Sequence, residues 1–230
     1  MRRFWKEVTV EQDEADWAVR LDGRAVRTPA RAALSGPSRA LADAIAEEWR
    51  SVGEEVDPRG MPLTGLANAA IDRVAPDRQA FAAGLGRYAE ADLACYRSEW
   101  PPELVERQQQ GWDPLLAWAR RRYDVNLATT SGLIHIPQPP ATVDRLVHEV
   151  TALDPFRLAG LSSLVTIGGS LIAGLAVLEK AIPTEEAWAA VSLDERWQLE
   201  QWGSDTEAEK ALDSRRRDFL AAARFLELLG

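Results

Sequence analysis

The chain has 230 residues, 46% of them hydrophobic and 27% charged, which is the composition of a folded globular protein with a sizeable core. Its formal net charge of −9 disfavours binding to nucleic acid or to anionic membrane surfaces, because both require a cationic surface. The single cysteine, Cys95, excludes an internal disulfide and suits a reducing compartment.

The first thirty residues predict β-strands. The segment WAVRLD alternates apolar and polar side chains, as a strand with one buried face does. Asp22-Gly23 is a hairpin signal, because glycine tolerates the positive φ that a tight turn requires. We therefore predict a three-stranded antiparallel meander over residues 3–28.

An amphipathic helix follows and would cover the apolar face of this meander. Leu41, Ile45 and Trp49 recur at helical spacing and form a single stripe. A Gly-Pro pair precedes the segment and Gly53 follows it, which are suitable start and stop signals.

Residues 56–65 are rich in proline and glycine and read as a connector, and nearly every later segment has helical periodicity. The predicted fold is therefore α+β in its N-terminal part, a short antiparallel meander covered by a helix, followed by an all-α orthogonal helical domain. We predict a small α/β domain over residues 1–62 and a helical domain over residues 63–230.

Two segments of the second domain are predicted in more detail. The apolar stretch at 132–136 could be a strand that returns to the N-terminal sheet. A final helix is predicted over about 205–229, with Ser204 and Glu207 in a capping box. Its predicted apolar side comprises Ala208, Leu212, Phe219, Ala222, Phe225 and Leu229.

Residues 158–178 carry no charge, and this length is enough to span a bilayer. Small residues such as Gly169 and Ala173 even have the spacing of packed membrane helices. However, eight of the 21 residues are Gly, Ser or Thr, and no aromatic belt flanks the segment. A helix buried on all sides is also continuously apolar. We predict a buried core helix and no stable membrane insertion, with a membrane-associated factor as the alternative.

Motifs for catalysis or cofactor binding are missing from the sequence: it has no P-loop, no dinucleotide fingerprint and no nucleophile elbow. His135 and His148 lack partners at metal-ligand spacing. His135 reads as a structural histidine, and Cys95 as a buried hydrophobe on a helix. We assign no catalytic residue, no cofactor and no metal. Because paired carboxylates are abundant, a small-molecule enzyme using such a pair in the inter-domain cleft stays an alternative.

Residues 185–209 hold eight acidic side chains and one basic one, a net charge of −7. The same window contains Trp188, Trp197 and Trp202. Aromatic anchors rimmed by charge of one sign are typical of protein-binding surfaces. Core tryptophans on a solvated acidic helix would give the same composition, so the pattern alone leaves both interpretations open.

Ordered blocks along nearly the whole chain resemble one protein family. They are RFWKEVTV, VRLDGRAVRTP, LADAIAEEW, VDPRGMPLTGLANAAIDRV, RYAEADLACYR, RQQQGWDPLLAWA, SSLVTIGGSLIAGLAV and LDERWQLEQWGSDTEAE. The sequence resembles the ATP12 family, assembly chaperones of F-type ATP synthase that bind the free alpha subunit of the catalytic head. Val52 departs from the family pattern, where glutamine is expected.

The resemblance implies a chaperone and not an enzyme. It implies that the protein binds free alpha subunit and shields its beta-facing surface until the hexamer forms. We expect a monomer without bound cofactor. The absence of a presequence before the first block favours the bacterial cytoplasm, with the mitochondrial matrix as the location of a processed eukaryotic homologue.

The resemblance also directs attention to particular residues. The predicted partner-binding residues are Asp194, Glu195, Trp197, Glu200, Trp202 and Asp205. We expect the carboxylates either to face the partner or to orient the binding helix, and the tryptophans either to fix that helix to its domain or to anchor the partner. The residues expected to be structural, at the junction between the two domains, are Trp49, Asp57, Pro58, Asn68 and Asp72.

Overall fold

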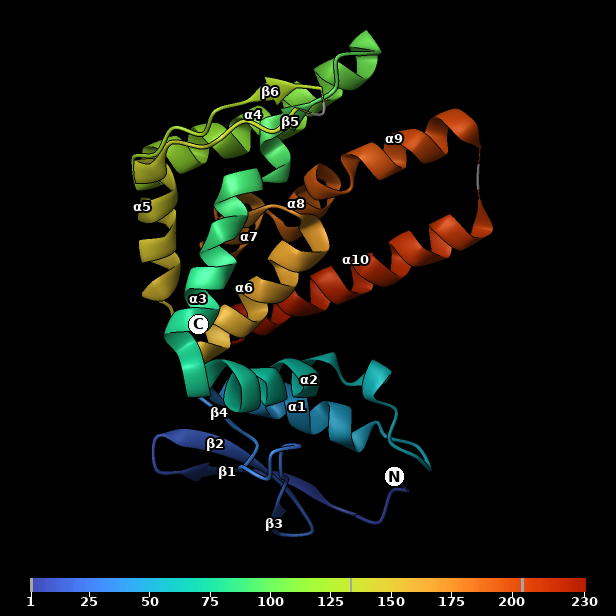
Figure 1. Ribbon diagram of the computed structural model, residues 1–230. Coiled ribbons are helices and arrows are strands. Elements are labelled where there is room, and N and C mark those ends of the chain that lie inside the picture. The colour runs from blue at the N-terminus through green and yellow to red at the C-terminus, as the bar shows by residue number, and fades with distance from the viewer. Residues whose placement is uncertain (1, 133, 204) are drawn as a thin grey trace. The chain divides into compact units, whose positions relative to one another are not determined.

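The computed structural model describes residues 2–132, 134–203 and 205–230 (Figure 1). The chain divides into two compact units. The first unit is Met1–Arg78 with Asp154–Gly160 and Arg224–Gly230, and the second is Gln79–Leu153 with Leu161–Ala223.

The first unit contains the predicted antiparallel meander. Its strands are β1 (Val8–Asp13), β2 (Asp16–Leu21), β3 (Arg24–Ala25) and β4 (Ser35–Gly36). β1 pairs with β2 along its whole length, and both β3 and the unpredicted β4 pair with β2. The turn between β2 and β3 has Asp22 at φ +48° and Gly23 at φ +78°, which confirms the hairpin signal.

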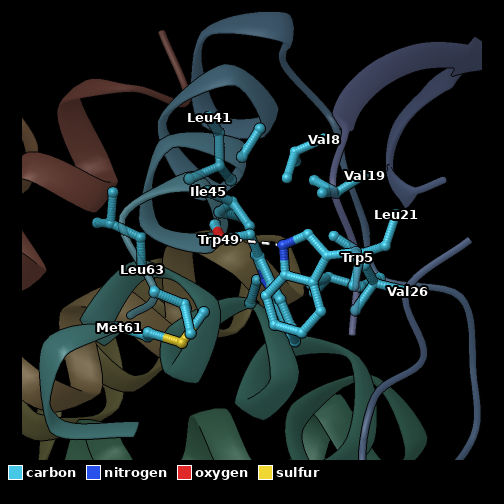
Figure 2. Packing of buried hydrophobic residues seen from close by; sticks show 14 of the residues in the cluster. Trp5, Val8, Val19, Leu21, Val26, Leu41, Ile45, Trp49, Met61 and Leu63 are labelled. Carbon is cyan, nitrogen blue, oxygen red and sulfur yellow. Dashed lines mark hydrogen bonds between the residues drawn. The ribbon is translucent and has the colours of Figure 1, made fainter. Parts of the chain in front are cut away.

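The helix α1 (Arg39–Arg50) packs its predicted stripe into the core of this unit. Leu41, Ile45 and Trp49 are buried, and Figure 2 shows them facing the side chains of the sheet. The indole Nε1 of Trp5 donates a 3.3 Å hydrogen bond to the carbonyl of Trp49, drawn as a dashed line in Figure 2. Each fully buried aliphatic side chain of such a core contributes roughly 1.5–3 kcal/mol.

The predicted domain boundary between residues 62 and 63 lies inside the first unit. The helix α2 (Pro62–Ala69) begins within the predicted connector, and its Leu63 and Ala67 belong to the same core. Its N-terminus is capped from α1, because the Glu48 carboxylate accepts the Leu63 N–H at 2.7 Å and the Thr64 N–H at 2.8 Å. The carboxylate thus joins α2 to α1 within the first unit. Of the predicted connector only residues 56–61 precede α2, and they contain a 3₁₀ turn at Pro58–Gly60.

The five residues expected at the domain junction all lie in the first unit. Asp57 caps the 3₁₀ turn by accepting the Arg59 N–H at 3.0 Å. Asp72 accepts a 2.7 Å hydrogen bond from the Thr28 hydroxyl. With Trp49 in the core, these contacts are structural contacts within one unit.

The second unit is mainly helical, as predicted. The helices of this part of the chain are α3 (Arg78–Gly86), α4 (Pro102–Tyr123), α5 (Pro140–Thr151), α6 (Pro155–Gly168), α7 (Leu171–Leu178), α8 (Thr184–Val191), α9 (Leu193–Trp202) and α10 (Thr206–Glu227). By the unit bounds, α6 begins in the first unit and α10 ends there.

The predicted strand at 132–136 needs correction. Leu133 lies outside the described residues, and residues 134–136 form no strand. The strand nearby is β6 (Thr130–Ser131), which pairs in parallel with β5 (Tyr96–Arg97) and not with the N-terminal sheet. Directly after β6, Gly132 adopts a φ of +83° and donates its N–H to the Arg97 carbonyl of β5 at 2.9 Å, which extends the pairing of the two strands.

The uncharged stretch 158–178 forms two helices where one was predicted. The chain turns between α6 and α7 at Gly169, whose φ of +69° favours glycine. Ser170 then caps α7 by accepting the Ala173 N–H at 3.0 Å. Leu164 and Leu171 are fully buried, which confirms the prediction of a core segment. Of the helices in the described chain, none combines the length and apolarity needed to cross a membrane.

The C-terminal half of α10 is the buried part of that helix. Phe219, Ala222 and Phe225 are buried as predicted. The predicted apolar side is wrong nearer the N-terminus, where Ala208 is exposed and Leu212 only half-buried. The helix is therefore packed at one end and largely solvated at the other.

Candidate functional site

The helix α9 carries most of the predicted site, and no residue of it is fully buried. It starts after Ser192, whose hydroxyl donates a 2.7 Å hydrogen bond to the Trp188 carbonyl, and it ends at Gly203, where φ is +87°. Glycine adopts this φ without strain, so it suits the position. In Figure 1 α9 is the orange helix that precedes the red α10. Every side chain of α9 is therefore at least partly exposed.

Asp194 connects the first turn of α9 to α4. Its Oδ1 accepts a 2.8 Å hydrogen bond from Nε2 of Gln108, a side chain that is only 2% exposed. Burial raises the pKa of the Asp194 carboxyl, the Gln108 hydrogen bond acts in the opposite direction, and neighbouring Glu195 raises it further. Among the described residues no cation lies within ion-pair distance of Asp194.

Glu195 and Glu200 each form an ion pair with a neighbouring helix. Glu195 Oε1 lies 2.7 Å from Nη1 of Arg215 on α10, and Glu200 Oε2 lies 2.6 Å from Nη1 of Arg107 on α4. All four side chains are about half exposed, so each pair is worth only about 0–1 kcal/mol. Together with the Asp194 contact, these pairs connect α9 to α4 and α10.

The three tryptophans of the acidic window have three different environments. Trp188 is buried, and its ring centroid lies 5.5 Å from that of Phe219. Trp197 is half-buried, with the Arg107 guanidinium 4.7 Å from its ring centroid. Trp202, at the end of α9, is 81% exposed. Only this last indole is free enough to be an anchor for a partner.

Asp205 lies just beyond α9, and its contact is local. Its Oδ1 accepts the Glu207 N–H at 2.9 Å and so caps the start of α10. The predicted capping residue, Ser204, lies outside the described residues. In the described chain Asp205 therefore has a structural role, which is to cap α10.

A groove of about 780 Å³ runs between α9, the start of α4 and the segment around β5; we call it the α4–α9 groove. Its principal lining residues are Tyr96, Arg97, Glu99, Trp100, Gln108, Asp194, Trp197, Gln198, Gln201 and Trp202. Trp100 is 74% exposed, so two highly exposed tryptophans border one hollow. Three of the six predicted site residues, Asp194, Trp197 and Trp202, line this groove, and the other three, Glu195, Glu200 and Asp205, do not.

Sequence reasoning missed the α4 side of the groove, including Trp100. The signal that could have indicated it is a tryptophan directly before Pro101-Pro102, where the chain starts α4. Arg97 was also missed. Its guanidinium donates to the Gln108 carbonyl at 3.0 Å and to Asp113 at 2.7 Å, and it lies 5.2 Å from the Trp112 ring centroid.

The cysteine and the histidine that the sequence offers for chemistry lie outside the helix α9. Cys95 is buried at the end of a 3₁₀ turn, and burial raises the pKa of its thiol to about 12. His135 is exposed, and its ring stacks on that of Tyr96, with Nδ1 2.8 Å from the Tyr96 hydroxyl. In the part of the chain that the structure describes, no three His, Cys, Asp or Glu side chains are grouped to hold a metal ion.

Known proteins resemble this chain over its full length. A family model described as "ATP12 chaperone protein" matches residues 2–120. "Protein atp12, mitochondrial" from Schizosaccharomyces pombe is 26% identical over 237 residues, covering 98% of this chain and 81% of the relative.

Two solved bacterial structures share the fold. Atp12 from Paracoccus denitrificans has a TM-score of 0.94 at 47% identity, covering 100% of this chain and 98% of that chain. The Atu1473 protein from Agrobacterium tumefaciens has a TM-score of 0.94 at 39% identity, covering 100% of this chain and 86% of that chain.

Proposed function

Because this chain belongs to the ATP12 chaperone family, we propose that it is an assembly chaperone of F-type ATP synthase that binds the free alpha subunit. In this proposal it shields the beta-facing surface of the alpha subunit until the hexamer forms. It acts as a monomer, in the bacterial cytoplasm or in the mitochondrial matrix. The observation that carries the proposal is the 81% exposure of Trp202 beside the α4–α9 groove.

An exposed tryptophan matters for binding because a partner that covers it gains free energy from the buried apolar surface. Burying a large aromatic side chain removes much apolar surface from water, and tryptophan is enriched among the residues that dominate binding energy. Trp202 and Trp100 both leave most of this surface exposed, and both line one groove. A partner that covers both indoles would remove this apolar surface from water, and the free energy gained would stabilise the complex.

The acidic side chains support a division of roles within the site. Glu195 and Glu200 are engaged with Arg215 and Arg107, so they favour the role of orienting α9. The net negative charge of residues 185–209 still contributes to the field around the groove, which would steer a partner of opposite charge. Of the four predicted acidic residues, only Asp194 lines the groove, so it is the one of these best placed to face a partner.

The alternative of a carboxylate-pair enzyme has less support. In the second unit the two carboxyls whose pKa is raised by burial are Asp92 and Asp194. Asp92 is fully buried and accepts hydrogen bonds from Ser170, Ile172 and Ala94, so its oxygens serve the folded chain. This leaves Asp194 without a second carboxyl matched to it for acid–base work.

The proposal is tested with purified alpha subunit diluted from denaturant. Light scattering is followed with and without a stoichiometric amount of this protein, and beta subunit is then added. The expected result is suppressed aggregation and a complex from which beta subunit displaces the chaperone. Aggregation at the same rate, with no complex by sizing chromatography, would refute the proposal. A complex that beta subunit leaves intact would refute the shielding of the beta-facing surface.

A further inference from the structure

We infer that the α4–α9 groove recognises an arginine side chain of its partner, held between the Asp194 carboxylate and the indoles along α9. The inference rests on the proposed function for the identity of the partner, and it names the chemistry that the partner must present.

The first observation is the charge of Asp194. Its neighbours Glu195 and Glu200 each have an arginine within 2.7 Å, whereas Asp194 accepts its hydrogen bond from the neutral Gln108 amide. Within the described residues Asp194 has no ion-pair partner, although it is half-buried and lines the groove. A partly buried carboxylate without a countercharge is stabilised by an incoming cation, because the pair compensates the lost hydration.

The second observation is the arrangement of side chains on α9. Asp194, Trp197, Gln198, Gln201 and Trp202 all line the groove and are spaced at helical intervals, so they form one face of the helix. From Asp194 to Trp202 is eight residues, or about 12 Å along the helix axis at roughly 1.5 Å per residue. An extended peptide covers this distance in about three to four residues. The groove thus matches a cation at one end and an apolar side chain at the other.

The third observation concerns which cation fits. A guanidinium is planar, can bond a carboxylate with two N–H groups, and stacks on aromatic rings. Stacking of this kind already occurs at two lining residues, because Arg97 lies over the Trp112 ring at 5.2 Å and Arg107 lies over the Trp197 ring at 4.7 Å. Glu99 adds an exposed carboxylate to the lining, beside the half-buried Asp194. The chemistry favours arginine over lysine, whose ammonium is a compact, strongly hydrated charge.

The probe is the peptide LAARAAL, acetylated and amidated, which places leucine three residues from arginine in both directions. Two matched peptides replace arginine with citrulline, a neutral isostere, or with lysine. Binding to the full chain is followed by the indole N–H resonances of Trp100, Trp197 and Trp202 in NMR spectra. We expect the arginine peptide to bind at least about tenfold more tightly than the citrulline peptide, and several-fold more tightly than the lysine peptide.

Two variants separate recognition by Asp194 from general attraction to an acidic protein. Asp194→Asn should reduce the preference for arginine over citrulline to less than about threefold. Asp144→Asn removes the charge of an exposed side chain on α5, outside the groove lining, and should keep the preference. Equal binding of the arginine and citrulline peptides, an unchanged preference in Asp194→Asn, or no binding at millimolar peptide would overturn the inference.

The outcome is distinct from that of the proposed function. If alpha subunit forms the complex but the peptides do not discriminate, only the arginine inference fails. If the peptides discriminate as expected and alpha subunit forms no complex, the groove recognises arginine but the proposed client is wrong.

Discussion

Nε2 of Gln108 donates a 2.8 Å hydrogen bond to Oδ1 of Asp194, and this contact joins α4 to the first turn of α9. The same buried amide accepts the Ser98 N–H through its Oε1 at 2.7 Å. One side chain therefore connects the helix that carries the predicted site to the segment that carries Trp100. The shape of the α4–α9 groove depends on this glutamine more than on the half-exposed ion pairs of α9.

Replacing Gln108 with leucine should lower the free energy of unfolding by about 1–3 kcal/mol, because the Ser98 N–H loses its partner and Asp194 its donor. Gln109→Leu is the control, since Gln109 is an exposed neighbour on the same helix. Both variants are measured by urea unfolding. Equal losses for the two variants would show that the amide contacts of Gln108 do not contribute to stability.

Asp92 gives the second unit a pH-dependent contribution to stability. Full burial raises the pKa of its carboxyl above the ordinary value of 3.8, while hydrogen bonds from Ile172, Ser170 and Ala94 act in the opposite direction. Folding therefore shifts this carboxyl towards its protonated form relative to the unfolded chain. The stability that this raised pKa contributes to the folded state is complete below the unfolded-state pKa of Asp92. It is lost as pH rises through the raised folded-state pKa.

Asp92→Asn tests this dependence. Whichever way its amide turns, an N–H group faces one of the donors, so at about pH 4.5 the variant should be less stable than wild type by about 1–3 kcal/mol. The gap should narrow as pH rises towards about 8, because only wild type loses stability by ionisation at this position. Unfolding curves across this range provide the measurement, and a gap independent of pH would contradict the raised pKa.

Leu164→Asp tests the assignment of the uncharged stretch to the core. Leu164 is 0% exposed, and an unpaired buried charge costs several kcal/mol, which approaches the stability of a whole domain. We expect this variant to be unfolded by circular dichroism at 25 °C. Thr166→Asp is the control, because Thr166 is exposed on the same helix, and it should fold. A folded Leu164→Asp protein would mean that α6 is not packed as described.

Local patterns predicted much of the fold. The Asp22-Gly23 hairpin and the Leu41, Ile45, Trp49 stripe follow from alternation, turn chemistry and helical periodicity, which are properties of neighbouring residues. The break between α6 and α7 was missed because it depends on Gly169 at positive φ and on capping by Ser170. Glycine and serine in an apolar stretch also fit a continuous helix.

The candidate site was less predictable because it combines segments distant in sequence. Composition identified the acidic window around α9, but it could not separate the buried Trp188 from the exposed Trp202. Trp100, which lines the same groove, is about one hundred residues away along the chain, and only tertiary structure brings it there. Long-range contacts of this kind leave no periodicity in the sequence.

Charge exchange between Glu200 and Arg107 tests whether the ion pair orients α9. Glu200→Lys alone breaks the pair and reverses a charge, so it should slow association with alpha subunit while costing about 1 kcal/mol or less of stability. Adding Arg107→Glu restores an ion pair in the opposite sense, and the net charge of wild type with it. Stopped-flow rates at low salt should then recover. Persistent slow association in the double variant would indicate that Glu200 contacts the partner directly.

Glu195→Lys combined with Glu200→Lys examines the field of the acidic window. Both ion pairs are half-exposed, so the fold should survive with a loss below about 2 kcal/mol. Association should be slower than in wild type, and raising salt should slow wild type towards the variant, because steering is screened over roughly 10 Å at 0.1 M. An unchanged rate at low salt would mean that this charge does not steer the partner.

The most direct test of the account is a titration of alpha subunit into Trp202→Ala, with a thermal melt on the same sample. Because Trp202 is 81% exposed, its removal should leave the melting temperature unchanged and weaken binding by about 30-fold or more, which corresponds to about 2 kcal/mol. Trp188→Ala is the control, since this tryptophan is buried against Phe219 and its loss should lower the melting temperature. Wild-type affinity for alpha subunit in Trp202→Ala would contradict the account, because the client would then bind without the groove.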